Sequence, residues 1–234
     1  MIERRKWLRT LRKENERQED LLSPVFDERW GEVDDLHRTY VAALLSRLHE
    51  KGTVLDAACG TGKYFQLVLD AGHSLLGVDH ARGHLTRAME KFPQVPTEKH
   101  DLQELPYREQ FDGVMCIDAM EFVPPEDWPV VMTRFRQATR SDGWLYLTIE
   151  LAPEEALTLA TEDARRLGLP VANGEAIWDD PDGAYYHYYP SIPQVYAWLA
   201  DAGFEIEEET AGPREYEGYA YHHVLARVAS GPHL

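Results

Sequence analysis

Apolar and polar positions alternate along the middle of this chain in a way that separates strands from helices. Four short apolar runs, each the length of a strand, occur at residues 53–55, 74–78, 111–117 and 144–149, and a weaker strand pattern occurs at 95–99. Patterns of helical period lie between them, at residues 63–71 and 81–91 and after Pro124-Pro125. Strands that alternate with helices indicate βαβ units, and therefore a mostly parallel sheet.

Both ends of the chain add further elements. Residues 1–20 read as a charged helix with a thin apolar seam, Ser23-Pro24 ends it, and residues 34–48 form a second helical pattern. After the fifth strand, the sequence predicts helices at 153–167 and 191–202 and a closing β-pair at 204–207 and 220–228. Residues 169–190 show neither a helical nor an alternating pattern, so we expect a long loop rich in aromatic side chains.

The stretch 54–62, Val-Leu-Asp-Ala-Ala-Cys-Gly-Thr-Gly, joins the first strand to the first helix through a turn of small residues. A helix N-terminus that follows such a turn can approach an anionic or nucleotide ligand closely. A dinucleotide fingerprint would need a third Gly where Phe65 stands, which disfavours NAD. A phosphate-binding Walker loop is disfavoured by Ala57 and Tyr64 at two of its fixed positions.

Four aspartates each follow one of the first four predicted strands, at positions Asp56, Asp79, Asp101 and Asp118. A single aspartate at the end of a strand is usually a cap or a turn residue. Ligands of open parallel sheets bind outside the carboxyl ends of the strands, so four acids in register predict one shared crevice.

The Gly turn and the strand-terminal acids together resemble the class I S-adenosylmethionine-dependent methyltransferase family, over roughly residues 40–150. The common first motif of that family is V-L-D-x-G-C-G-x-G, from which this chain departs with Ala58. The resemblance implies a Rossmann-like α/β fold with a seven-stranded, mostly parallel sheet, helices on both faces and an antiparallel last strand. It also implies S-adenosylmethionine as cofactor and S-adenosylhomocysteine as product.

The resemblance assigns the cofactor-binding residues by their place in the motifs. Asp79 matches the acid that takes the ribose hydroxyls, and Asp101 with the Leu102 backbone matches the element that reads the adenine edge. Asp118 would lie near the methionine part of the cofactor, and Asp56 would orient the Gly turn or meet the cofactor ammonium. The full expected set is Asp56, Ala58, Gly60, Gly62, Asp79, His80, Asp101, Leu102 and Asp118.

The expected domains are an N-terminal helical cap, residues 1–49, and a methyltransferase domain, residues 50–230, in which residues 150–190 form an insertion on the substrate side. The cap either packs passively on the core or acts as a lid over the site. The candidate catalytic residues are His187, within the aromatic segment, and Glu121, after the fourth strand; His222 and His223 are further candidate bases. Many relatives have Glu-His-Val where this chain has Glu121-Phe122-Val123. The role of that histidine therefore cannot be transferred to this chain.

The net charge of −17 limits the choice of partners. Residues 1–20 carry seven basic and five acidic side chains, which leaves −19 on the rest of the chain. Such a surface opposes binding to nucleic acid or to an anionic membrane, and favours a small-molecule acceptor. With no apolar run long enough to span a membrane, no signal-peptide pattern and two unpaired cysteines, the expected location is the cytoplasm.

No histidine or cysteine pattern predicts a metal site, and Asp179, Asp180 and Asp182 are expected to form a turn. Three alternatives to small-molecule methyl transfer remain at this stage. The protein could bind S-adenosylmethionine without transferring its methyl group, it could methylate RNA or protein, or, least favoured, it could use NAD. The sequence specifies neither the acceptor atom, nitrogen, oxygen or carbon, nor the oligomeric state.

Overall fold

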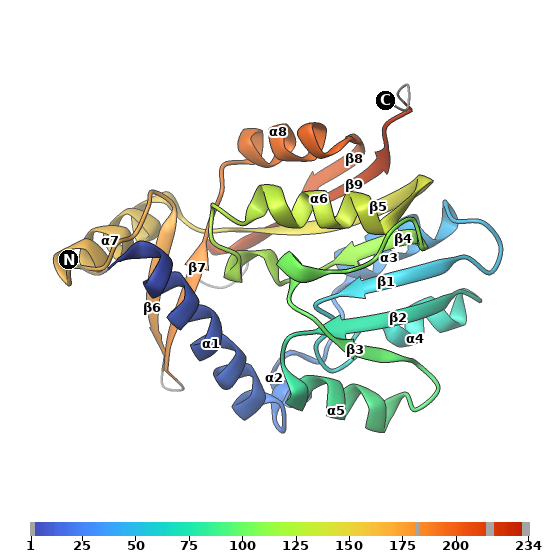
Figure 1. Ribbon diagram of the computed structural model, residues 1–234, viewed down its shortest axis with the longest axis horizontal. Coiled ribbons are helices and arrows are strands. Elements are labelled where there is room, and N and C mark those ends of the chain that lie inside the picture. The colour runs from blue at the N-terminus through green and yellow to red at the C-terminus, as the bar shows by residue number, and fades with distance from the viewer. Residues whose placement is uncertain (1–2, 181–182, 214–217, 231–234) are drawn as a thin grey trace.

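A computed structural model describes residues 3–180, 183–213 and 218–230 of the chain. Its main sheet has seven strands in the order β3-β2-β1-β4-β5-β9-β8 (Figure 1). The first five run parallel to one another, and β9 is antiparallel to both of its neighbours. The strands are β1 (Thr53–Ala57), β2 (Ser74–Asp79), β3 (Thr97–Lys99), β4 (Phe111–Cys116), β5 (Thr139–Leu151), β8 (Phe204–Ala211) and β9 (Ala220–Val228).

Helices cover both faces of the sheet because successive residues of each strand point to opposite sides. On one face, Val54 and Met115 pack against α3, α4 and α5, and on the other, Leu55 and Cys116 pack against α6 and α8. The helices are α1 (Arg4–Leu22), α2 (Phe26–Trp30), α3 (Asp35–Ser46), α4 (Phe65–Asp70), α5 (Arg82–Lys91), α6 (Trp128–Ala138), α7 (Glu154–Arg166) and α8 (Ile192–Ala202), with short 3-10 helices η1 (Leu102–Glu104) and η2 (Met120–Phe122). The predicted Rossmann-like architecture is confirmed.

The segment 169–190 is not the loop that the sequence predicts. It forms strands β6 (Glu175–Asp180) and β7 (Gly183–Tyr188), which pair with each other as a separate antiparallel sheet next to α7. Tyr186 and Tyr188 of β7 are buried, whereas Tyr185 and His187, which alternate with them, are half-buried and line a cleft that Tyr186 also contacts. This alternation cannot be seen in the sequence because both faces of β7 are aromatic. The expected Asp-rich turn is also corrected in part, since Asp179 and Asp180 end β6, while Asp182 lies outside the described residues.

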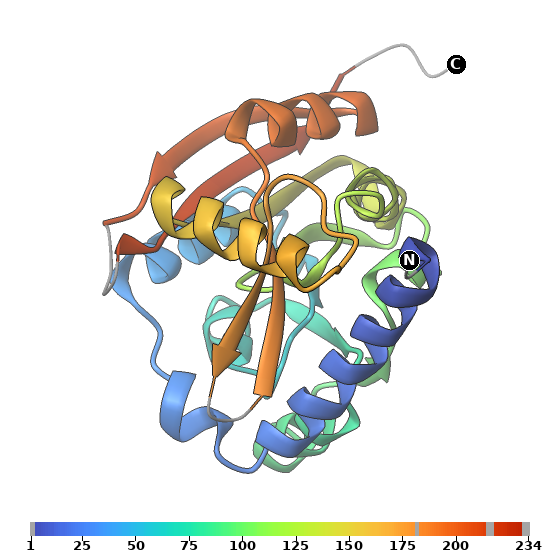
Figure 2. The same cartoon turned by 90° about the vertical axis from the view of Figure 1, so that its left-hand side faces the viewer.

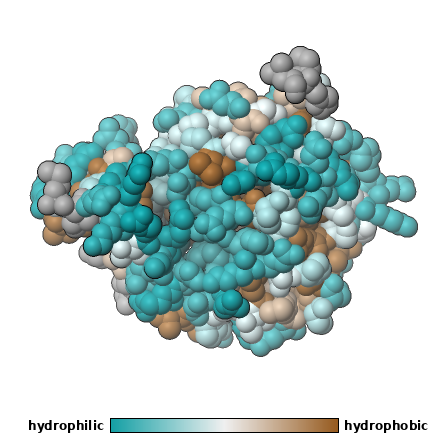
Figure 3. Space-filling view, viewed as in Figure 1, coloured by the Kyte–Doolittle hydropathy of each residue, from teal (hydrophilic) through white to brown (hydrophobic). Residues whose placement is uncertain are grey.

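The N-terminal helices take two different places. Helix α3 packs in the core on one face of the sheet, and α1 lies at the edge of the molecule between α5 and the β6–β7 pair (Figures 1 and 2). Arg4 of α1 forms ion pairs with Glu126 and Glu175, and Arg12 bonds to Asp127 at 2.7 Å. Figure 3 shows that the face over this region is largely hydrophilic. Polar contacts, together with the buried Trp7 ring that packs edge-on against Tyr186, therefore hold α1 against the β6–β7 pair and the loop before α6, while apolar packing holds α3.

Gly77 of β2 makes room for Phe65, the residue that disfavours an NAD fingerprint. A Cβ at position 77 would lie 2.5 Å from Phe65 Cζ and 2.9 Å from Cys59 Sγ. We expect Gly77→Ala to lower the free energy of unfolding by about 1–3 kcal/mol, as overpacking does in a rigid core. Chemical denaturation would measure it, with Ser74→Ala at an exposed position of the same strand as the control. Equal stability of the two variants would contradict the packing role.

Candidate functional site

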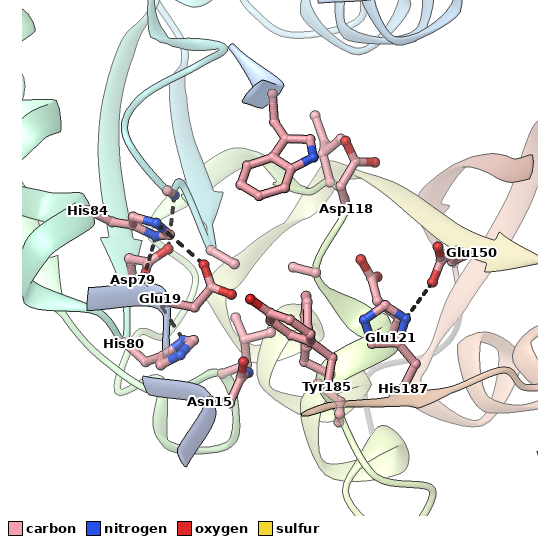
Figure 4. Close-up of a pocket in the computed structure, with 18 of the residues that line it drawn as sticks. Asn15, Glu19, Asp79, His80, His84, Asp118, Glu121, Glu150, Tyr185 and His187 are labelled. Carbon is pink, nitrogen blue, oxygen red and sulfur yellow. Dashed lines mark hydrogen bonds and ion pairs between the residues drawn. The ribbon is translucent and has the colours of Figure 1, made fainter. Parts of the chain in front are cut away.

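A cleft of about 1000 Å³ opens at the carboxyl ends of β1, β2, β4 and β5. Two groups of polar side chains lie at its opposite ends (Figure 4). Asp79, His80, His84 and Glu19 form one group, and Glu121, Glu150 and His187 form the other, with Asp118 and Tyr185 between them. The volume is at the upper end of that of common ligand pockets, which is enough for a cofactor together with an acceptor.

The Gly turn forms part of the cleft wall. Gly60 has a φ of 52°, and a Cβ there would meet only Phe26 at 3.9 Å and His84 at 4.0 Å, so its backbone faces open space. Ala58 also lines the cleft and holds a φ of 67°, where the resembled motif has Gly. Gly62 has a φ of 82° but does not line the cleft. A Cβ there would lie 2.9 Å from the Phe65 ring. Glycine is therefore needed at position 62 for the backbone conformation of the turn and for its close packing against Phe65.

Asp79 is fixed by the turn that it faces. Its Oδ2 accepts a hydrogen bond from Gly60 N at 2.9 Å, and its Oδ1 accepts one from Ala81 N at 2.8 Å. Burial opposes its ionisation, but contacts with His84, with His80 and with the Ala81 amide prevail and lower its pKa. A carboxylate has about four lone-pair sites, so two remain for ligand donors. Asp79 is thus an ionised acceptor held rigidly at the cleft wall.

Asp56 lies behind the Gly turn and not in the cleft wall. It is almost fully buried, and among the described residues its Oδ2 has no hydrogen-bond partner. Burial, with a smaller contribution from the charge of Asp79, raises the pKa of Asp56 to about 8. The expectation that it meets the cofactor directly stays a prediction, and this placement favours its other expected role, the support of the turn.

The expected adenine-reading residues also line the cleft. Asp101 caps η1, where its Oδ1 accepts from Gln103 N at 3.4 Å, and Arg12 of α1 lies 3.4 Å from its other oxygen. Burial raises the pKa of Asp101, and the charge of Arg12 counteracts this. Leu102 and His80 are in the same wall, and His80 Nδ1 is 3.9 Å from Asp79 Oδ1.

Asp118 follows β4 with a φ of 51° and faces the middle of the cleft. Its Oδ1 lies 2.9 Å from His37 Nε2, and its backbone N–H donates to Thr148 Oγ1 at 2.7 Å. Lys63 Nζ lies 4.0 Å from the other carboxylate oxygen, Asp118 Oδ2. The carboxylate is therefore held by groups from α3, β5 and the Gly turn.

The second group of side chains meets at the far end of the cleft. Glu121, in η2, is only 4% exposed, and burial together with the charge of Glu150 raises its pKa well above the ordinary value. His187 Nδ1 lies 3.0 Å from Glu150 Oε2 and 2.9 Å from the Tyr189 hydroxyl. Both predicted catalytic residues thus line one cleft, and their chemical roles stay predictions.

His222 and His223 do not line the cleft. His223 is buried against Tyr146, whose hydroxyl lies 2.8 Å from its Nδ1, and burial lowers its pKa to about 4. His222 Nε2 contacts Glu209 at 2.7 Å on the edge strand β8. The expectation that one of these two histidines reaches the site receives no support from their positions.

Sequence reasoning did not single out several polar residues of the cleft, among them Glu19, His37, His84 and Glu150. Glu150 lies at the carboxyl end of β5, so the rule that selected the four aspartates could have selected it as well. Glu19 and His37 belong to helices α1 and α3, and no motif signals that these helices reach the cleft.

The residues present fit the cofactor that the resemblance implies. A glycine backbone faces open space beside an ionised carboxylate with free lone pairs, and half-buried Asp101 lies in the same wall. Within the described residues, no group of three or more His, Cys, Asp or Glu side chains is arranged to hold a metal ion. In the same part of the chain, no helix is both long and apolar enough to cross a membrane.

Comparison with known proteins gives consistent results. Residues 54–143 match the model of a methyltransferase domain family. The malonyl-(acyl-carrier protein) O-methyltransferase of Hamiltonella defensa subsp. Acyrthosiphon pisum (strain 5AT) is 32% identical over 94 residues, which are 40% of this chain and 36% of that protein. The chain therefore matches about a third of the length of this curated relative.

Solved structures share the fold over most of the chain. An S-adenosylmethionine-dependent methyltransferase from Methanosarcina mazei superposes with a TM-score of 0.68 at 17% identity, and the match covers 79% of this chain and 95% of that one. The 1,6-didemethyltoxoflavin-N1-methyltransferase of Burkholderia thailandensis, crystallised with its substrate and S-adenosylhomocysteine, has a TM-score of 0.67 at 18% identity, covering 98% and 92%.

Proposed function

Because the chain belongs to the class I S-adenosylmethionine-dependent methyltransferase family, we propose that it transfers the methyl group of S-adenosylmethionine to a small-molecule acceptor. The observation that carries the proposal is the division of one cleft into two ends. Gly60 and Asp79 form one end, Glu121, Glu150 and His187 form the other, and Asp118 lies between them. When bound, the cofactor supplies an electrophilic methyl group attached to a sulfonium.

The side chains of this protein would act mainly by binding and alignment. Asp79 would accept hydrogen bonds from the ribose hydroxyls, and Asp101 with Leu102 would meet the adenine. Holding two reactants in near-attack geometry can supply about 7–11 kcal/mol of the barrier. His187 and Glu121 are placed where a proton leaving the acceptor could be taken up.

The small-molecule acceptor is supported by charge and by the make-up of the cleft. The acidic chain opposes RNA binding, and α1 and the β6–β7 pair contribute side chains to the wall of the cleft. The relatives named above act, by their names, on a malonyl-acyl-carrier protein and on a toxoflavin precursor, so an acceptor small at its reacting end is consistent with both. Two free, buried cysteines support a reducing location such as the cytoplasm.

Residues 1–49 are proposed to act as two units. Helix α3 belongs to the core, whereas α1 contributes Leu8, Leu11, Arg12 and Glu19 to the cleft wall. We propose that α1 covers the bound cofactor as a lid, held by the polar contacts of Arg4 and Arg12.

The test is calorimetric titration followed by turnover. We expect S-adenosylmethionine and S-adenosylhomocysteine both to bind, and S-adenosylhomocysteine to accumulate when a library of small acceptors is supplied. Failure of both nucleosides to bind would overturn the proposal. Binding without formation of S-adenosylhomocysteine with any acceptor would favour the non-methylating alternative, and a product formed only with RNA or protein would overturn the small-molecule assignment.

A further inference from the structure

We propose that the acceptor carries a basic nitrogen, an ammonium or amidinium group, which Glu121 and Glu150 bind at the end of the cleft opposite the Gly turn. The inference rests on the proposed function, because it concerns the acceptor of the same site. It is carried by four observations: an unpartnered buried carboxylate, a second carboxylate beside it, the sign of the charges along the cleft, and the aromatic wall.

Glu121 is a buried acid that lacks the partners such a group normally has. It is 4% exposed and lines the cleft, and among the described residues its Oε2 has no hydrogen-bond partner. Buried polar atoms are nearly always hydrogen-bonded, and an unsatisfied one destabilises the folded protein. A donor that arrives with a ligand would remove this destabilisation.

Glu150 brings a second carboxylate to the same place from β5. Its Oε2 is buried without a well-formed hydrogen bond, although His187 Nδ1 lies 3.0 Å away. The titratable groups that act on Glu121 are Glu150, Asp118 and Glu19, and the His187 ring packs against Phe122, the next residue. Burial and the neighbouring acids raise the pKa of Glu121, because two negative charges this close together repel each other. A cation between the two acids would allow both to ionise.

Acidic side chains outnumber basic ones along the cleft. Its described wall contains eight carboxylates, Glu19, Glu32, Asp34, Asp79, Asp101, Asp118, Glu121 and Glu150, against three basic side chains, Arg12, Arg29 and Lys63. Arg12 already pairs with Asp101 and Asp127. Within the described part of the chain, neither Glu121 nor Glu150 has a lysine or arginine partner. An anionic acceptor would be repelled here, and a cationic one attracted.

Aromatic rings surround the two acids. The Phe122 ring meets His187 edge-on at 4.8 Å, and Trp178 lies 6.4 Å from Tyr189 and 6.1 Å from Tyr219 between ring centroids. Trp178 Nε1 donates to the Tyr189 hydroxyl at 3.0 Å, which fixes both rings. Aromatic faces attract cations and also accept apolar substituents. The pocket therefore suits an amine that carries an aryl or alkyl body.

The experiment uses the full chain, saturated with S-adenosylhomocysteine, and matched fragment triplets. In each triplet, one aryl or alkyl skeleton ends in an ammonium, a hydroxyl or a carboxylate, and binding is measured by ligand-observed NMR and calorimetry. We expect the ammonium member to bind at least about tenfold more tightly than the other two, and Glu121→Gln or Glu150→Gln to remove most of that preference. Glu162→Gln, at an exposed acid of α7 that does not line the cleft, is the control and should leave the preference unchanged.

Proton release gives a second readout. Calorimetry of the ammonium fragment in buffers of different ionisation enthalpy should show protons released by the wild type and not by Glu121→Gln, because the bound cation drives ionisation of the acid. An unchanged affinity in both glutamine variants, equal binding of the carboxylate fragments, or no binding of any fragment would overturn the inference.

S-adenosylhomocysteine is titrated into every sample first. Its failure to bind the wild type would instead overturn the proposed function, and normal binding to the variants shows that they are folded.

Discussion

Asp79→Asn is expected to weaken the binding of S-adenosylmethionine and S-adenosylhomocysteine by about ten- to a hundredfold, the loss that accompanies removal of a charged hydrogen-bond acceptor. Both oxygens of Asp79 already accept backbone N–H groups, from Gly60 and Ala81. An asparagine can offer only one acceptor oxygen, so its amide would face one of these donors as well as the ribose hydroxyls. Calorimetric titration of both nucleosides measures the loss.

A ligand analogue separates a direct contact from a disturbed turn. If Asp79 binds the ribose, S-adenosylhomocysteine that lacks one ribose hydroxyl should bind the wild type more weakly, but Asp79→Asn little more weakly than the parent ligand. Asp201→Asn makes the same change of charge on an exposed part of α8 and should bind both ligands as the wild type does. Equal losses for the analogue in wild type and Asp79→Asn would show that the side chain supports the turn without touching the ribose.

The sequence predicted most of the fold because the parallel strands are short and buried on both faces. Such strands read as apolar runs, and the Gly turn and strand-terminal acids mark where each one ends. The start of β5 was placed too late, at residue 144, because Arg140, Ser141 and Asp142 are exposed and break the apolar pattern. The β6–β7 pair was missed for other reasons: β7 is aromatic on both faces and shows no alternation, and β6 ends in two aspartates that resemble a turn.

The end of the cleft formed by the Gly turn could be predicted further than the end formed by Glu121 and Glu150. Seven of the nine expected cofactor residues line the cleft, and Asp56 and Gly62 lie behind it. A sequence motif indicates local backbone geometry. It therefore predicts which residues of one turn and of the neighbouring strand end lie together. Glu19, His37 and Glu150 arrive from separate elements, so only the tertiary packing of α1, α3 and β5 brings them to the cleft. Glu121 was recognised as a candidate, but its burial beside Glu150 depends on that same packing.

The stability of the cofactor-free protein should fall with rising pH because of Asp56. Its folded-state pKa of about 8 is above the ordinary value of about 4, so between these pH values the native state holds a proton that the unfolded chain has released. The contribution is favourable below about pH 4 and is lost progressively as the pH rises through 8. The loss for this single group is on the order of 5 kcal/mol over that range.

Asp56→Asn isolates this effect, because asparagine has nearly the same shape and no charge. Denaturant unfolding between pH 4 and 9 should show the variant to be more stable than the wild type at pH 8 to 9, by several kcal/mol. The gain in stability should vanish near pH 4, because the wild-type acid is neutral there. The buried asparagine amide, without a hydrogen-bond partner, would lower the free energy of unfolding of the variant by about 1–3 kcal/mol.

Glu19 and Glu121, whose pKa values are also raised by burial, affect both proteins equally and cancel in the difference. Asp70→Asn, exposed on α4, should track the wild type at every pH. If the curves of wild type and Asp56→Asn run parallel across the range, Asp56 is ionised in the folded protein, and a donor or water behind the Gly turn must satisfy the oxygen that has no protein partner.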